Sequence, residues 1–361
     1  MKVITVVGAR PQFIKAATVS RIINQSREIT EKIIHTGQHF DQNMSEIFFK
    51  EMDIPKPNYN LDINNLNHGA MTGQMLEGIE KILIGEKPDW MLVYGDTNST
   101  LAGALAAKKL NIRVAHVEAG LRSYNRKMPE EINRIVTDHI SDLLFAPSDV
   151  AIKNLTKEGI CNDKISKVGD VMYDASLFYT NDLIKQNHVL EKNNLESKKY
   201  LLCTIHRAEN TDIPDRLDAI FQGLEEVAQQ MEIIMPLHPR TKIKLDAIGF
   251  NSEKSLINFI APVGYLDMMI LEKNAKLIIT DSGGIQKEAY FHKVPCLTLR
   301  NETEWVELIE KGYNYLVEDL KRIPELTISS LQKKYNFEAD CIYGQGNSAN
   351  LIVNNLINYR I

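Results

Sequence analysis

Residues 3–15 read VITVVGARPQFIK, and this run decides the fold class because it passes directly from a strand through a turn into a helix. Val3–Val7 is short, apolar and β-branched, as buried strands are, and Gly8 ends it. A strand followed at once by a helix is the opening unit of an α/β fold with a parallel sheet. The turn also places Arg10 and Lys15 at a helix N-terminus, where backbone N–H groups favour an anion. A solvated helix start without a ligand is the alternative for these two cations.

The rest of the chain repeats this alternation of strand and helix. Short apolar runs predict strands at Val3–Val7, Lys32–Thr36, Trp90–Tyr94, Arg113–Glu118, Leu143–Ala146, Ile165–Val168, Tyr200–Thr204, Glu232–Pro236, Ser255–Ile260, Ala275–Thr280 and Pro295–Leu299. Apolar residues at helical spacing predict helices at Phe13–Ser26, Met44–Met52, Met71–Ile84, Ser99–Leu110, Glu130–Ser141, Ser148–Glu158, Arg216–Gln230 and Gly264–Lys273. We therefore predict two doubly wound α/β lobes, since 361 residues exceed what one core usually supports. The polar stretch Asn181–Lys199 is expected to be the solvated approach to the second lobe.

Composition narrows the class of protein and its ligands. Hydrophobic residues make up 44% of the chain, yet no apolar run approaches the roughly 20 residues of a membrane-spanning helix, and no signal segment precedes the first strand. A soluble, cytoplasmic protein is therefore expected. The net charge of -5 gives no general attraction to nucleic acid or to an anionic membrane. The four cysteines lack C-x-x-C spacing, so no metal site and no disulfide framework is expected.

Acidic residues follow strands of the first half at the points where catalytic groups usually lie. Asp96 comes shortly after the strand Trp90–Tyr94, and could serve as an acid or base or could cap the next helix. Glu118 ends the following strand, where a buried carboxylate is costly unless it is paired or functional. Glu130 follows Pro129 in the first turn of a helix, where capping is again the alternative. Three carboxylates near one cleft favour acid–base chemistry.

Two histidines follow strands of the second half. His206 stands beside Arg207 after the strand Tyr200–Thr204, and could bind a phosphate or move a proton. A hydrogen-bonded structural histidine is the alternative. His238 leaves another strand in a similar place, and we expect it to support or position the substrate.

The segment TDSGGIQKE, from Thr280 to Glu288, is the most specific local signal. Ser282 is expected to be the N-cap of a helix, and Gly283 and Gly284 expose backbone N–H groups at its N-terminus. Such a helix start can cradle a phosphate without a metal. Glu288 lies on the first turns of this helix and could accept hydrogen bonds from a ribose diol. The alternative is a plain tight turn. The chain lacks the G-x-G-x-x-G and Gly-Lys-Ser/Thr patterns, so neither NAD binding nor ATP hydrolysis is predicted.

A series of short motifs runs in order along nearly the whole chain. They are GARP at 8–11, YGDT at 94–97, HVEAGLR at 116–122, PEEINR at 129–134, DSGGIQ at 281–286 and YGQG at 343–346. Together they resemble the UDP-N-acetylglucosamine 2-epimerase family. The resemblance implies a GT-B-like α/β architecture, with two Rossmann-like lobes, the active-site cleft between them, and a homodimer. It implies an N-terminal lobe at 1–170, a nucleotide-binding lobe at 171–348, and a last helix at 349–361 that returns to the first lobe.

The resemblance also implies an activity. It is the non-hydrolysing inversion of C2 in a UDP-linked 2-acetamido sugar, without a cofactor, for precursors of surface polysaccharides such as lipopolysaccharide. A base removes the C2 proton while UDP leaves C1, which forms a 2-acetamidoglycal, and UDP adds back after protonation of the opposite face. By resemblance, the acid–base carboxylates are Asp96, Glu118 and Glu130; Arg10, Lys15 and His206 contact the phosphates or the leaving oxygen; and Ser282, Gly283, Gly284 and Glu288 hold the diphosphate and ribose.

Some segments depart from the family pattern. Gln12 stands where the family has glutamate, and Trp305 stands where a nucleotide-contacting arginine is usual. Gln38–Met44 lacks the arginine of members that their own substrate activates, so no such allostery is expected. With HGAMTG at 68–73, these changes are closer to the branch acting on UDP-2,3-diacetamido-2,3-dideoxyglucuronate than to the branch that interconverts UDP-N-acetylglucosamine and UDP-N-acetylmannosamine.

Other functions use a similar architecture. A hydrolysing 2-epimerase would release UDP, and a GT-B glycosyltransferase would need an acceptor groove but no cluster of three carboxylates. A nucleotide-sugar sensor would keep the cleft without the chemistry.

Overall fold

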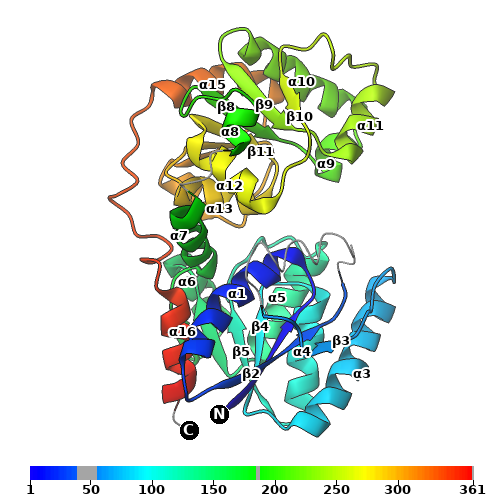
Figure 1. The fold of residues 1–361 in the computed structure, drawn as a ribbon, viewed down its shortest axis with the longest axis vertical. Helices are drawn as coiled ribbons and strands as arrows, with labels where there is room; N and C mark the ends of the chain where they lie inside the picture. Colours follow the sequence, from blue (N-terminus) through cyan, green and yellow to red (C-terminus); the bar gives the residue numbers. More distant parts are fainter. Residues whose placement is uncertain (39–54, 184–187, 360–361) are drawn as a thin grey trace. The chain divides into compact units, whose positions relative to one another are not determined.

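The computed structural model describes residues 1–38, 55–183 and 188–359. The chain forms two compact units: Met1–Ala175 together with Cys341–Ile361, and Ser176–Asp340 (Figure 1). The helix predicted at Met44–Met52 lies outside the described residues, as does most of the departing segment Gln38–Met44.

The first unit is built on a seven-stranded parallel sheet. Its strands are β1 (Lys2–Val7), β2 (Thr30–His35), β3 (Tyr59–Asn60), β4 (Trp90–Tyr94), β5 (Arg113–Val117), β6 (Leu143–Ala146) and β7 (Ile165–Lys167), in the order β3-β2-β1-β4-β5-β6-β7. The central strands β1 and β4 are almost wholly buried, as expected of a sheet covered on both faces. The doubly wound α/β fold predicted from the alternation is confirmed for this unit, as is the Rossmann-like lobe that the family resemblance implies.

Helices connect these strands and cover the sheet. They are α1 (Arg10–Gln25), α3 (His68–Glu86), α4 (Asn98–Lys109), α5 (Pro129–Ile140), α6 (Asp149–Lys157) and the late helix α16 (Ser348–Asn358). Helix α7 (Val171–Leu183) begins in this unit and ends in the second, since the boundary falls between Ala175 and Ser176. Although α16 comes near the end of the chain, it packs against α1 and buries Ile352, Val353 and Leu356. Just beyond it, the ring of Tyr359 lies edge-on to Trp90 at the sheet.

The second unit repeats the architecture with a six-stranded parallel sheet. Its strands are β8 (Tyr200–Thr204), β9 (Glu232–Pro236), β10 (Asn258–Ile260), β11 (Leu277–Thr280), β12 (Cys296–Thr298) and β13 (Asn314–Leu316), in the order β10-β9-β8-β11-β12-β13. Its helices are α8 (His188–Lys192), α9 (Ala208–Thr211), α10 (Pro214–Ala228), α11 (Pro239–Ala247), α12 (Tyr265–Asn274), α13 (Gly283–Phe291), α14 (Val306–Glu310) and α15 (Ile323–Gln332), with single 3₁₀ turns at Asn162–Lys164 in the first unit and Leu320–Arg322 in the second. Separate apolar clusters pack on the two faces of this sheet, which makes the second unit Rossmann-like as well.

The strand order reverses once in each sheet, and these reversals locate the ligand sites. In the first unit the chain runs outward from β1 to β3 and then returns to β4, and in the second it runs from β8 to β10 and returns to β11. Connections from the two neighbouring strands then lead to opposite faces, so ligands bind at the carboxyl ends of the strands there. The residues after β1, β4, β8 and β11 are therefore the ones to examine.

One sequence prediction about the chain's organisation is wrong in part. The stretch Asn181–Lys199 is not simply a solvated approach, because it contains α8, whose Val189 and Leu190 are buried in a core of the second unit together with Leu195. Apolar side chains within a polar stretch are easily overlooked when composition is averaged. No helix among the described residues is long and apolar enough to cross a membrane.

Candidate active site

The turn after β1 is closed by a buried glutamine. Gln12 accepts hydrogen bonds from the backbone N–H groups of Gly8 (2.8 Å) and Ala9 (3.0 Å), and its Nε2 donates to the carbonyl of Tyr94 (2.8 Å) at the end of β4. A glutamate at position 12 could not donate to this carbonyl, so the departure from the family pattern joins the two strands that flank the reversal. Arg10 is the first residue of α1 and is half-buried at its N-terminus.

Lys15 and Glu118 form a buried ion pair beside the same turn. Their side chains are only 10% and 8% exposed, and Lys15 Nζ contacts Glu118 Oε2. A Cβ at Gly95 would lie 3.3 Å from each of these two atoms, so the pair lies directly against the residue before Asp96. The structure thus brings together one predicted cation and two predicted carboxylates.

Glu118 has an unusual backbone conformation. Its φ of 71° is in the left-handed region, which costs an L-residue about 1–2 kcal/mol. The conformation is held by its own N–H and that of Ala119, which both donate to the carbonyl of Phe145 at 3.2 and 3.1 Å. Strained backbone of this kind is concentrated at functional sites, and here it belongs to a predicted acid–base residue.

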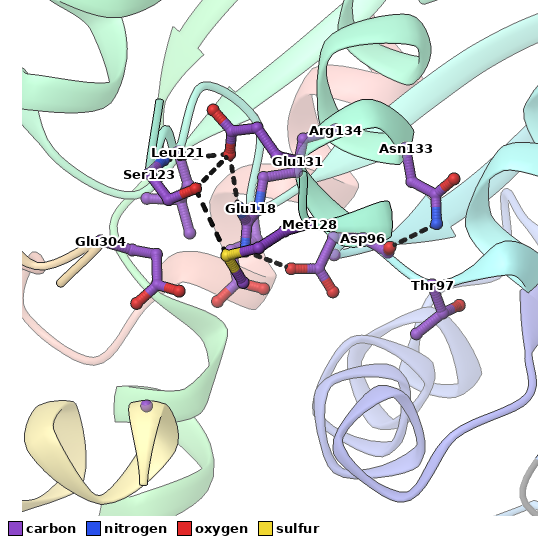
Figure 2. A network of polar contacts seen from close by, with 12 residues as sticks. Asp96, Thr97, Glu118, Leu121, Ser123, Met128, Glu131, Asn133, Arg134 and Glu304 are labelled. Carbon is purple, nitrogen blue, oxygen red and sulfur yellow. Dashed lines mark hydrogen bonds and ion pairs between the residues drawn. The ribbon is translucent and has the colours of Figure 1, made fainter. Parts of the chain in front are cut away.

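Asp96 is held by the first turns of α5 (Figure 2). Its carboxylate accepts from Arg134 Nη2 at 2.6 Å, and its backbone carbonyl accepts from Asn133 Nδ2 at 2.9 Å. Thr97, not Asp96, is the N-cap of α4, so the capping alternative for Asp96 does not apply. With 31% of its side chain exposed, the Asp96 carboxylate is fixed in direction yet remains accessible.

Glu130 and Glu131 are neighbours with opposite surroundings. Glu131 is fully buried and accepts from the backbone N–H groups of Ser123 and Tyr124 and from Arg134 Nη1, the last at 2.7 Å (Figure 2). Burial raises the pKa of Glu131, but these hydrogen bonds outweigh it, and the pKa lies below its ordinary value. Glu130 is exposed in the first turn of α5, and no hydrogen bond is recorded for its carboxylate among the described residues. Glu131 is therefore structural, and Glu130 is open to a ligand.

A second buried network lies behind the two carboxylates and was not predicted. His116, on β5, contacts the carboxylate of Asp138 with Nδ1 and the carbonyl of Gly95 with Nε2, both at 2.7 Å. Asp138 also accepts from Arg122 at 2.8 Å, and Arg122 makes two hydrogen bonds of 2.7 Å to Glu158. Helix α5 buries the polar residues Glu131, Arg134 and Asp138 and leaves Ile132 and Val136 exposed. The sequence signal for this network was that the polar residues of α5 share one face of the helix.

In the second unit, Asp281 organises the residues that follow β8. Its carboxylate accepts from the backbone N–H groups of His206 (3.0 Å) and Arg207 (3.0 Å), and it lies 3.2 Å from His206 Nδ1. Partial burial lowers the pKa of His206, and the carboxylate of Asp281 raises it. The nearby Arg207 and His238 lower the pKa further, so it lies below its ordinary value. His238 is exposed and accepts from the N–H of Arg240 at 3.2 Å as the N-cap of α11.

The start of α13 is surrounded by cations. Ser282 occupies the N-cap position as predicted, but its side chain makes no capping hydrogen bond. A Cβ at Gly283 would lie 3.5 Å from Arg207 Nη2 and 3.8 Å from Arg300 Nη1, so two guanidinium groups approach the helix N-terminus. Gly284, the next residue, is exposed. Backbone N–H groups, a helix dipole and two arginines together form an anion site.

Two further side chains pack against α13. Trp305, at the position where the family has an arginine, donates from Nε1 to the carbonyl of Gly283 at 2.8 Å, and Lys287 lies 4.3 Å above its ring. The tryptophan therefore supports the glycine turn. Glu288 is buried and accepts from the hydroxyl of Tyr265 at 3.1 Å.

The two sites have complementary chemistry. The first unit offers fixed carboxylates at the end of two neighbouring strands, which suits proton transfer at carbon. The second unit offers N–H groups and guanidinium groups, which suit a diphosphate. Within the described residues, no group of three or more His, Cys, Asp or Glu side chains is arranged to hold a metal ion.

Comparison with known proteins gives the family. The family model described as UDP-N-acetylglucosamine 2-epimerase matches residues 21–357. The chain belongs to the UDP-N-acetylglucosamine 2-epimerase family. The polar site residues of this epimerase lie inside the matched range, except Arg10, Gln12 and Lys15.

Relatives of this epimerase match it along their whole length. A UDP-N-acetylglucosamine 2-epimerase homolog from Methanococcus maripaludis is 54% identical, over 99% of this chain and 100% of the relative. The UDP-2,3-diacetamido-2,3-dideoxy-D-glucuronate 2-epimerase from Pseudomonas aeruginosa is 49% identical, over 98% of each. The crystal structure of the Methanocaldococcus jannaschii UDP-GlcNAc 2-epimerase in complex with UDP-GlcNAc and UDP is 46% identical, with a TM-score of 0.88 over 99% of each chain.

Proposed function

We propose that the chain is a non-hydrolysing 2-epimerase that inverts C2 of a UDP-linked 2-acetamido sugar. One observation carries the proposal: Glu118, strained and paired with Lys15, lies against Gly95, the residue before the accessible carboxylate of Asp96. Two rigid carboxylates at one place provide the acid and the base that an inversion at carbon requires. The family assignment supports the same reaction, because the named relatives are 2-epimerases.

The reaction removes the C2 proton and the C1 substituent together. A carboxylate takes the proton, the C2–H electron pair forms the C1–C2 double bond, and the C1–O bond breaks toward UDP. A protonated carboxyl group then returns a proton to the opposite face of C2, while UDP adds back to C1. Because a C2 proton is weakly acidic, its removal must be coupled to stabilisation of the departing diphosphate.

The second unit is suited to hold that diphosphate. Ser282, Gly283 and Gly284 present the N-terminus of α13, with Arg207 and Arg300 beside it. We assign His206 to the leaving phosphate oxygen, because Asp281 accepts from its backbone N–H and lies 3.2 Å from its ring Nδ1. Arg10 and Lys15 are assigned to contacts with the nucleotide phosphates.

The remaining predicted residues receive finer roles in the proposal. Glu130 is assigned as the third acid–base carboxylate, because it is exposed on the helix that holds Asp96. Glu288 is assigned to the ribose diol, and His238 to a supporting contact near His206, from whose ring its own is 6.5 Å away. A homodimer and a cytoplasmic location belong to the same proposal, and are tested by sedimentation equilibrium and cell fractionation.

Proton NMR in D₂O tests the reaction and the substrate in one experiment. The purified protein is incubated with UDP-N-acetylglucosamine and, separately, with UDP-2,3-diacetamido-2,3-dideoxyglucuronate, while deuterium entry at C2 and the manno product are followed. Exchange in one sugar without an acceptor supports the proposal and identifies the substrate branch. Release of one UDP per sugar would instead indicate the hydrolysing reaction, and absence of exchange in both would refute the epimerase proposal.

A further inference from the structure

His116 is a fully buried histidine whose two ring nitrogens both have oxygen partners. Nδ1 lies 2.7 Å from Asp138 Oδ1, and Nε2 lies 2.7 Å from the carbonyl oxygen of Gly95. A backbone carbonyl can only accept, so Nε2 must carry a proton. Nδ1 then either donates to an ionised Asp138 or accepts from a protonated one, and the pair holds the same number of protons in both cases.

The surroundings of Asp138 favour the ionised form. Its second oxygen accepts from Arg122 Nη1 at 2.8 Å and from the N–H of Gly120 at 3.1 Å. Burial raises the pKa of Asp138, but the charges and hydrogen bonds of His116 and Arg122 outweigh it and hold the pKa below its ordinary value. With Asp138 ionised, both ring nitrogens of His116 donate and the ring is an imidazolium.

This pair connects the two loops that carry the acid–base residues. Gly95 directly precedes Asp96, and Gly120 follows Glu118 by two positions. Both glycines have left-handed backbones, with φ of 62° and 84°, and a Cβ at Gly120 would overlap the carbonyl oxygen of Ala151. His116 donates to the carbonyl of Gly95 in one loop, and Asp138 accepts from the N–H of Gly120 in the other. The pair therefore joins the two loops.

We propose that His116 and Asp138 are positioning residues, a buried imidazolium–carboxylate pair that sets the separation of the Asp96 and Glu118 carboxylates. This inference rests on the proposed epimerisation for its kinetic consequence, but the protonation state of the ring can be measured without turnover. A misplacement of about 1 Å at a reacting centre can lower a rate roughly 100-fold, so the pair matters to kcat although it contacts no substrate.

Nitrogen NMR tests the imidazolium directly. The protein is labelled with ¹⁵N-histidine, and the His116 signals are assigned by their loss in His116→Gln. We expect both ring nitrogens of His116 in the wild-type protein to show protonated shifts, each coupled to its own proton. A single protonated nitrogen would overturn the imidazolium, whatever the enzyme's activity.

Two matched substitutions test the positioning role. Asp138 and Asp142 lie four residues apart and each accepts a hydrogen bond from a backbone N–H in or next to β5. Asp138 accepts from Gly120, beyond the carboxyl end of β5 and near Glu118, whereas Asp142 accepts from Val114 at 2.8 Å near its amino end. Asp138→Asn should lower kcat roughly 100-fold while leaving KM and UDP affinity within about twofold. Asp142→Asn should leave all three constants within about twofold, since β5 lies between it and the carboxylates.

His116→Gln is the second variant, because it keeps an amide donor but removes the charge. The same separation of kcat from KM is expected, and it decides the matter if Asp138→Asn does not fold. An unchanged kcat in the variant that folds, or an equal loss of kcat in Asp142→Asn, would overturn the positioning role. If the wild-type protein exchanged no C2 proton, the proposed function would fail, whereas the nitrogen spectrum would still test the pair.

Discussion

The two units share a fold and a strand reversal, but they treat charge in opposite ways. At the reversal of the first unit, Lys15 is paired with Glu118 and Arg134 with Asp96, so both of these carboxylates have a partner within the protein. At the reversal of the second unit, Arg207 and Arg300 both approach Gly283 at the N-terminus of α13. Arg300 is paired with Glu304 at 3.2 Å, whereas no salt bridge joins Arg207 to an acidic side chain among the described residues.

The difference teaches what each unit contributes. Charges that are already paired are held in place before a ligand arrives, which suits groups that must transfer protons with accurate geometry. A site with positive charge in excess has its partner still to come, which suits the binding of a diphosphate. On this view the first unit is arranged for chemistry and the second for affinity, and the four predictions below test that division.

The largest effect is expected for Glu118→Gln. Loss of an acid–base group should lower the rate of C2 proton exchange about 10²–10⁴-fold, because the amide neither accepts nor returns a proton at neutral pH. UDP affinity should change by no more than about twofold, since Glu118 is assigned to proton transfer at C2 and not to the diphosphate. Exchange is followed by proton NMR in D₂O and UDP binding by calorimetry. A parallel loss of UDP affinity would break the division between the units.

The next effect separates Glu131 from its neighbour. Glu131→Gln removes one partner of a buried, hydrogen-bonded ion pair with Arg134 and should lower the free energy of unfolding by about 3 kcal/mol. The folded-state pKa of Glu131 is depressed, so its stabilisation is present above the unfolded-state pKa and is lost as pH falls through the folded-state pKa. The difference between wild type and variant in urea unfolding should therefore shrink toward low pH.

Glu130→Gln is the matched control for that substitution. Because Glu130 is exposed, its change should leave the unfolding free energy within about 0.5 kcal/mol while lowering turnover. A large loss of stability from Glu130→Gln, or none from Glu131→Gln, would contradict the assignment of Glu131 as the structural partner of Arg134.

Arg207→Met probes the local positive charge at the N-terminus of α13. A charge-assisted hydrogen bond contributes roughly 1.5 kcal/mol, so the dissociation constant of UDP should rise about tenfold and depend less on salt. Arg322→Met removes an exposed arginine of the same unit that is already paired with Glu325 at 2.8 Å, and should leave UDP affinity unchanged. Equal effects of both changes would mean that UDP affinity does not depend on a local site that contains Arg207.

The smallest effect sharpens the claim of accurate geometry in the first unit. Gly95→Ala and Gly159→Ala each place an L-residue in a left-handed conformation, at φ of 62° and 82°, and each should cost about 1 kcal/mol in thermal unfolding. A Cβ at Gly159 would meet open space, whereas one at Gly95 would press on the Lys15–Glu118 pair. Only Gly95→Ala should therefore lower the exchange rate, and an equal loss in both would contradict the assignment.

The predictability of this fold from sequence depends on where apolar residues are concentrated. The strands Trp90–Tyr94 and Tyr200–Thr204 are found with their predicted bounds, because each is a short run buried on both faces. The short edge strands β3 and β13 were missed, since Tyr59–Asn60 and Asn314–Leu316 contain no apolar run from which a strand could be inferred. The opposite edge strands β7 and β10 lie within the predicted strands Ile165–Val168 and Ser255–Ile260, so a strand's place in the sheet does not by itself decide whether it is found.

The site was predictable where residues follow strands, and less so where they lie within helices. Asp96, Glu118 and His206 were singled out by their position after a strand, and the structure shows which partners hold them. Asp138 lies in the last turn of α5, where an isolated acid is usually solvated, and only its shared inward face with Glu131 and Arg134 would have pointed to it. The proton-transfer roles remain predictions for the exchange experiments.

The packing of α16 against α1 has a consequence for the order in which the molecule is made. Residues 341–361 complete the first unit, yet they leave the ribosome after all of Ser176–Asp340. While the second unit is being synthesised, the surface of α1 that α16 will cover is still open to water. The second unit is continuous in the chain and can fold as it emerges, whereas the first must wait, so a nascent chain halted before residue 341 is expected to need a chaperone over α1.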